Sequence, residues 1–85
     1  MAEMKNGVLI VDVDPLTTIL DYTGSGIPSG ILVIANAILD QVYAGIHPQE
    51  VRISKDAHRA LVLAKRPMDH YGIKVLDIPV YAEGV

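Results

Sequence analysis

A cluster of basic side chains between positions 52 and 66 is the part of this sequence best suited to binding a charged partner. On a helix, Lys55, Arg59 and Arg66 would share one side, and within this stretch only Asp56 opposes them. Such a face can bind phosphate groups or an acidic protein surface. The residues that we assign to partner binding are Arg52, Lys55, Arg59 and Arg66.

The residues around this basic face narrow the kind of partner. No aromatic residue is interleaved with the bases, which argues against a surface that stacks single-stranded bases. Residues 1–50 hold six acids, Asp12, Asp14 and Asp21 among them, against a single lysine. We therefore expect residues 52–66 to contact an acidic protein surface, on another copy of the chain or on a larger protein. Nucleic acid is the alternative partner.

Patterns typical of catalysis or metal binding are missing from the sequence. There is no cysteine, which excludes disulfides, thiolate metal sites and thiol chemistry. No two of the histidines, His47, His58 and His70, have the i, i+4 spacing of a helical metal site, and no GxSxG motif occurs. The sequence therefore predicts a protein that is not an enzyme and that uses no metal or cofactor.

Two acids at the end of an apolar stretch offer an alternative to that prediction. Val8 to Asp14, VLIVDVD, followed by Thr17, resembles the opening of haloacid-dehalogenase-type phosphotransferases. The resemblance implies that Asp12 is a nucleophile and that both acids bind Mg²⁺ through oxygen ligands. However, Pro15-Leu16 stands where that family has Gly-Thr, and the chain is too short for that fold. We interpret the pair as solvent-exposed acids at the end of a strand.

A glycine-rich stretch, Thr23 to Gly30, precedes the longest apolar run. Gly24, Gly26 and Gly30 lie ahead of an expected helix, and the N-terminus of a helix attracts anions. The spacing matches neither GxGxxG nor a P-loop. A flexible connection is the simpler interpretation, and anion binding by the Gly24–Gly30 loop stays open.

The apolar run from Ile31 to Tyr43, ILVIANAILDQVY, is the element on which the rest of the chain must pack. Leu32 and Val33 lie off its main apolar stripe, so we expect a helix that needs cover on more than one face. The residues that follow the i, i+3, i+4, i+7 pattern are Ile31, Ile34, Ala35, Ile38, Leu39 and Val42.

The ends of this helix are also marked in the sequence. Pro28 suits a first helical turn, Ser29 offers a capping hydroxyl, and Gly45 is a natural stop. We therefore expect a helix over 29–44. It is too short and too interrupted to span a membrane, which needs about 20 apolar residues.

The remaining elements are expected to be short strands and one further helix. Residues 1–6 read as a polar lead-in that ends in an Asn-Gly turn signal, and residues 15–22 fit either a helix or a strand. The other expectations are a central strand over 8–13 covered on both faces, a strand over 50–53, a helix over 55–65 capped by Ser54, and strand-like residues 71–81 with an edge or a bulge at Pro79.

The composition favours a small domain that is stabilised by association. Eighty-five residues make one domain, 1–85, and 51% of them are apolar although Trp and Phe are absent. So small a chain buries a limited share of its apolar surface, so oligomerisation or docking is the available support. The N-terminus lacks a signal peptide, and we expect a cytoplasmic protein or one assembled into a virion.

Residues 48–85 carry one further resemblance. A short strand, EVRIS, a helix containing AHRAL, and YGIKVLDIPVYAEG follow in that order. This run resembles the region near the end of tailed-phage major capsid proteins, and also small phage proteins of unknown function. The resemblance implies a phage setting and an assembly role, and it carries over no functional residue.

Together these patterns predict an α+β fold, in which a sheet of three or four strands packs against a long apolar helix and a second, shorter one. The predicted function is that of a small non-enzymatic interaction or assembly protein. It would self-associate or dock on a larger protein, with a nucleic-acid-binding module as the alternative.

Overall fold

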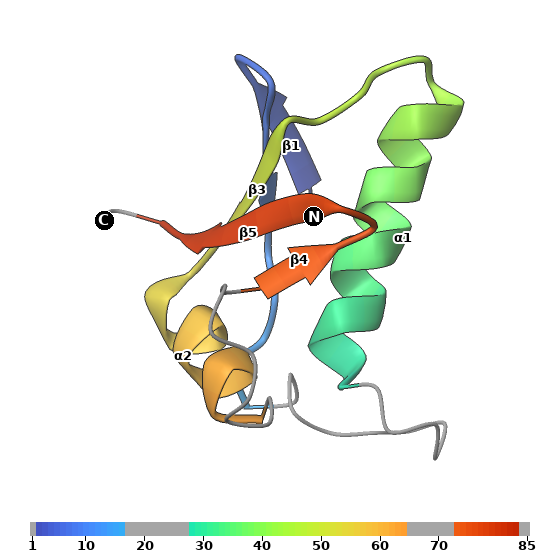
Figure 1. The fold of residues 1–85 in the computed structure, drawn as a ribbon. Coiled ribbons are helices and arrows are strands. Elements are labelled where there is room, and N and C mark those ends of the chain that lie inside the picture. Colours follow the sequence, from blue (N-terminus) through green and yellow to red (C-terminus); the bar gives the residue numbers. More distant parts are fainter. Residues whose placement is uncertain (1, 17–27, 65–72, 84–85) are drawn as a thin grey trace.

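The computed structural model describes residues 2–16, 28–64 and 73–83, and within these ranges the chain forms an α+β domain. Lys65, Arg66 and His70, most of the ambiguous residues 15–22, and the first part of the Gly24–Gly30 loop lie outside them. The elements are β1 (Ala2–Lys5), β2 (Val8–Val11), α1 (Ser29–Tyr43), β3 (Glu50–Ile53), α2 (Lys55–Ala64), β4 (Ile73–Val75) and β5 (Ile78–Ala82) (Figure 1).

The strands form one mixed sheet in the order β1-β2-β3-β5-β4. The three inner strands, β2, β3 and β5, are parallel, and β1 and β4 each join an end as the antiparallel partner in a hairpin. The α+β prediction is confirmed. The predicted count of three or four strands is wrong, because two stretches expected to hold one strand at most contain hairpins.

The first hairpin lies where the sequence suggested a polar lead-in. Asn6 and Gly7 have φ values of 53° and 81°, and Lys5 pairs with Val8 across them. A two-residue turn with positive φ at both positions matches the twist of antiparallel strands. The Asn-Gly signal was therefore read correctly as a turn, while the polar strand before it was missed.

Both helices pack on the same face of the sheet. α1 contacts β2 and β4, α2 contacts β5, and the helices contact each other. Burial in β2 and β3 alternates accordingly: Leu9, Val51 and Ile53 are buried, while Ile10 and Arg52 on the opposite face are only partly buried. Placing β2 inside the sheet was correct. Among residues 2–16, 28–64 and 73–83, however, helices cover only one face of β2, and the expected cover on its second face is not found there. We call that opposite face the open face.

α1 confirms the expected helix, with differences at its start and in its buried side. Pro28, with φ −58° and ψ 142°, precedes the helix as its N-cap rather than lying in the first turn, and Ser29 is the first helical residue. Ala37 is buried, whereas Leu39, expected in the core, is 37% exposed. α1 is therefore rotated slightly about its own axis, relative to the orientation that the sequence predicted.

The C-terminus of α1 ends as the sequence indicated. Gly45 has φ 84°, its N–H donates to the Val42 carbonyl at 2.9 Å, and the Ile46 N–H donates to the Gln41 carbonyl at 2.9 Å. These two bonds form a Schellman motif, in which a left-handed glycine turns the chain and satisfies the last carbonyls.

α2 begins at the cap that the sequence marked. The Ala57 N–H donates to Ser54 Oγ at 3.2 Å, which satisfies one of the first free amides of the helix. Ala57 and Leu61 are fully buried. The apolar side of α2 thus lies against the sheet, while Val62 and Leu63 face outward.

Residues 73–82 form the second hairpin rather than one continuous strand. Val75 pairs with Ile78 across a turn at Leu76 and Asp77. β5 lies inside the sheet and its pairing with β4 is uninterrupted, so neither the edge nor the bulge expected at Pro79 is found. Because the pair next to a two-residue turn is hydrogen-bonded, the following pair, Lys74 with Pro79, is not. Pairing with β3 starts only at Val80, so the missing proline N–H costs no ladder bond.

The turn of this hairpin uses unfavourable residues, which leads to a prediction. Leu76 has φ 51° and is 55% exposed, although asparagine or glycine suits such a position. Leu76→Asn is expected to raise the free energy of unfolding by about 0.5–1 kcal/mol in urea melts. Leu63→Asn, at an exposed position in α2, should lower it instead because asparagine is a poor helix former. A loss of stability in Leu76→Asn would contradict the strain argument.

Candidate interaction surfaces

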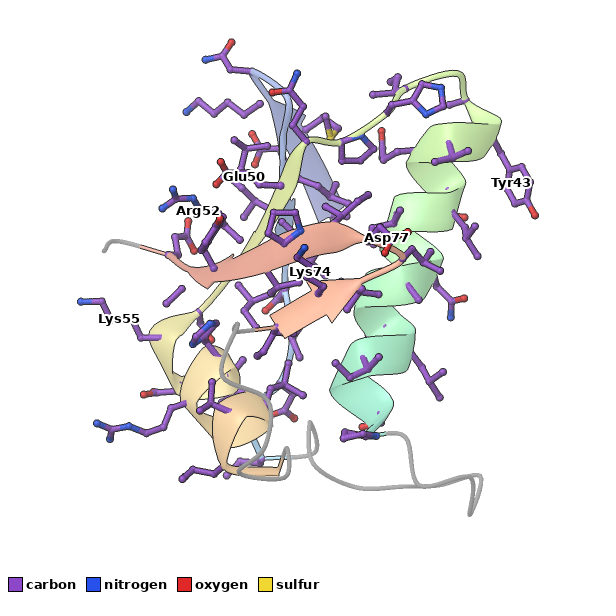
Figure 2. The ribbon with its side chains drawn as sticks, viewed as in Figure 1. Tyr43, Glu50, Arg52, Lys55, Lys74 and Asp77 are labelled. Atoms are coloured by element: carbon purple, nitrogen blue, oxygen red, sulfur yellow. The ribbon has the colours of Figure 1, made fainter. Side chains whose placement is uncertain are left out.

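Arg52, one of the predicted partner-binding residues, already has partners inside the molecule. It lies in β3 on the open face, and Figure 2 shows it beside Glu50, pointing away from α1. Its Nε donates to Glu50 Oε2 at 2.7 Å, and its guanidinium carbon lies 5.8 Å from the Tyr81 ring centroid. An arginine that is paired with a carboxylate and placed over an aromatic ring offers less charge to an external phosphate.

Lys55 and Arg59 remain as an exposed basic pair on α2. They are four residues apart and therefore neighbours on one side of the helix, and Asp56 lies next to Lys55 in the first turn. Arg66 lies outside the described residues. The structure therefore places Lys55 and Arg59 together on α2, whereas Arg52 lies on β3 and contacts Glu50 and Tyr81.

The strand-end acids lie where the sequence placed them, and each is exposed. Asp14 Oδ1 accepts a hydrogen bond from the Leu16 N–H at 2.9 Å, which is the local turn contact typical of aspartate before a proline. Asp12, Glu3, Ser54 and Glu83 line a hollow of about 510 Å³ at the carboxyl ends of β2, β3 and β5. Among the described residues, no three His, Asp or Glu side chains are placed to hold a metal ion.

The most conspicuous surface is the side of α1 that faces away from the sheet. Leu32, Leu39 and Tyr43 are 36%, 37% and 83% exposed, and Val33 is 45% exposed. Figure 2 shows the Tyr43 ring pointing away from the rest of the molecule. Leu32, Asn36, Leu39 and Tyr43 follow one another at spacings of 4, 3 and 4 residues, which places them on one side of the helix. The surface that we call the α1 outer face consists of Leu32, Val33, Asn36, Leu39, Asp40 and Tyr43.

Two exposed apolar residues, Ile46 and Leu76, lie near α1. Ile46, just past the helix, is 43% exposed, and the turn that carries Leu76 lies beside α1 (Figure 1). Asp40 is the only charged residue of α1. Sequence reasoning noted that Leu32 and Val33 lie off the buried stripe, which was the available signal for this surface, but it assigned Leu39 to the core.

Comparisons with known protein families, with curated proteins and with solved structures find no match for this chain. Within the described residues, neither α1 nor α2 is long and apolar enough to cross a membrane.

Proposed function

We propose that this chain is a small, non-enzymatic assembly protein that associates with copies of itself, or docks on a larger protein, through the α1 outer face. The observation that carries the proposal is the row of exposed Leu32, Leu39 and Tyr43 on a helix whose only charge is Asp40. A helix that is apolar on its exposed side as well as its buried side is typical of an element that a partner covers.

The size of the surface indicates what the partner must cover. A helix of this length is about 22 Å long, and a standard interface buries about 800 Å² on each partner. One side of α1 is smaller than that, so the contact also needs Ile46, exposed just past the helix, and Leu76, exposed in the turn beside α1. Tyr43 is suited to be the main anchor, because exposed tyrosines bring a large apolar area at a small entropic cost.

The resemblance of residues 48–85 to tailed-phage capsid proteins supports an assembly role, and a phage setting is part of this proposal. Assembly proteins need a self-complementary or partner-complementary surface rather than a catalytic constellation. The apolar α1 outer face fits that need, and the acidic hollow near Asp12 does not require an enzymatic explanation.

Tyr43→Asp is expected to weaken self-association at least tenfold, because it places a charge where an apolar anchor is buried. The measurement is sedimentation velocity and light scattering across protein concentration and salt. Tyr43 is 83% exposed in the isolated chain, so the free energy of unfolding of the monomer should change by less than about 0.5 kcal/mol. Leu63→Asp, on the exposed side of α2, is the control and should leave association intact.

Two outcomes would contradict the proposed function. One is a chain that stays monomeric at about 1 mM and binds no larger protein through this surface. The other is nucleic-acid binding: a sub-micromolar, salt-sensitive complex that Arg59→Glu abolishes would favour the alternative module, since non-specific binding lies near 10⁻⁴ to 10⁻⁶ M. We rank that alternative second because Arg52 is held by Glu50 and Tyr81.

A further inference from the structure

β1 is an edge strand of the sheet. Among the described residues, no strand pairs with the backbone edge of β1 that faces away from β2. Lys5 and Val8 flank the Asn6-Gly7 turn, so this pair and the pair of Glu3 with Ile10 are the hydrogen-bonded ones. The backbone groups of Glu3 and Lys5 therefore point to β2. Those of Met4, between them, point away from β2 to the free edge.

The side chains of β1 alternate in a pattern that suits symmetric pairing. Glu3 and Lys5 are exposed and lie opposite Ile10 and Val8 on the open face, whereas Met4 lies on the helix side and packs against the core. A lysine on an edge strand usually discourages pairing with another chain. An opposite charge two residues away changes that effect, because a second copy can then offer each charge its complement.

We propose that β1 pairs with β1 of a second copy, antiparallel, with Met4 opposite Met4 of the second copy. The two sheets then continue into each other across a two-fold axis. This pairing rests on the proposed self-association for its partner, but it uses the backbone edge of β1 instead of the side chains of the α1 outer face.

The charges favour this register over the symmetric ones centred on Glu3 or Lys5. Two antiparallel edge strands related by a two-fold axis keep their open faces on the same side, so the axis must pass beside a residue that faces its own counterpart. An axis at Glu3 would oppose two glutamates, and an axis at Lys5 would oppose two lysines. An axis at Met4 instead opposes Glu3 to Lys5 of the second copy, and does so twice.

The direction of the free backbone N–H and C=O groups favours the same register. With Met4 facing its counterpart, the outward N–H and C=O groups of both residues exchange hydrogen bonds. The Glu3–Lys5 pairs then occupy the non-hydrogen-bonded positions, where facing Cα atoms are about 4.5 Å apart and side chains interact most closely. At the start of β1, Ala2 lines a hollow of about 400 Å³ together with Val33 and Asn36 of α1, among others.

Charge reversal at β1 gives the first test, measured by sedimentation velocity. Lys5→Glu or Glu3→Lys places like charges opposite each other in both pairs, so each is expected to weaken the dimer by roughly tenfold or more. The double variant Glu3→Lys/Lys5→Glu exchanges the charges and should restore wild-type affinity to within about threefold. Lys74→Glu makes the same charge change on β4, at the other end of the sheet, and should have no effect.

Hydrogen exchange of the wild-type chain gives a second test that needs no variant. The Met4 amide should exchange rapidly in dilute protein and become protected as concentration rises, while the Glu3 and Lys5 amides stay protected throughout by β2. Rapid Met4 exchange at a concentration where the protein is dimeric would overturn the pairing. So would a dimer that Lys5→Glu leaves unchanged.

The two proposals, edge pairing through β1 and association through the α1 outer face, can be disproved independently. If dimers form, Met4 stays unprotected and Tyr43→Asp dissociates them, edge pairing is wrong and the α1 outer face stands. If Met4 becomes protected, Lys5→Glu dissociates the dimer and Tyr43→Asp has no effect, edge pairing stands and the α1 outer face is wrong as the site of self-association. A chain that remains monomeric at about 1 mM overturns the edge pairing and self-association through either surface.

Discussion

Replacing Ile34 with alanine is expected to lower the free energy of unfolding by about 2–5 kcal/mol. Ile34 is fully buried in the middle of the inward side of α1, within the core cluster that includes Leu9 and Val51. Alanine removes the transfer free energy of the lost methyl and methylene groups and leaves a cavity that rigid neighbours fill only in part. A chain of this size has about 5 kcal/mol of stability, so much of the protein should be unfolded at 37 °C.

Denaturant melts of the variant and of a matched control test this expectation. Leu32→Ala lies two residues away in the same helix, on the α1 outer face, and its side chain is 36% exposed. It should cost less than Ile34→Ala by at least 1 kcal/mol in the monomer. Equal losses in the two variants, or a loss below about 1 kcal/mol for Ile34→Ala, would mean that α1 is peripheral to the core.

Leu61→Ala is expected to have an effect of similar size, about 2–5 kcal/mol, because Leu61 holds α2 on the sheet. Leu61 and Ala57 are the fully buried side chains of α2 among its described residues. Since alanine at 57 contributes little area, most of the apolar contact between α2 and the sheet depends on Leu61. Its loss should release α2 and with it the crossover between β3 and β5.

Leu63→Ala provides the control for the second prediction. It makes the same chemical change in the same helix, but Leu63 is 77% exposed, against 0% for Leu61. Surface substitutions of this kind usually change stability by less than about 0.5 kcal/mol. If both variants lose the same free energy, the difference in burial is not what stabilises α2, and the proposed role of Leu61 fails.

The sequence by itself determined the elements whose signals are local. Gly45 ends α1 because glycine tolerates a positive φ, and Ser54 begins α2 because its hydroxyl accepts a hydrogen bond from the Ala57 N–H. The period of apolar residues from Ile31 to Val42 was enough to identify α1. Each of these signals acts within one or two turns of chain, so it needs no knowledge of distant residues.

Tertiary structure alone decided that Ala2–Lys5 forms a strand and which sides of the helices stay exposed. The polar stretch Ala2–Lys5 becomes β1 because β2 supplies hydrogen-bond partners, which outweighs its weak intrinsic preference for a strand. Leu39 is exposed and Ala37 is buried because the packing of α1 on the sheet and on α2 sets the rotation of the helix about its axis.

For the predicted partner-binding residues too, local spacing could be read from the sequence, whereas contacts between strands could not. Spacing along the chain correctly made Lys55 and Arg59 neighbours on α2, since helical geometry is local. It could not show that Arg52 belongs to the open face, where strand pairing brings Tyr81 opposite it and where Glu50, two residues earlier on the same strand, accepts a hydrogen bond from it. Contacts between strands join residues distant in sequence, and their geometry exists only once the sheet has formed.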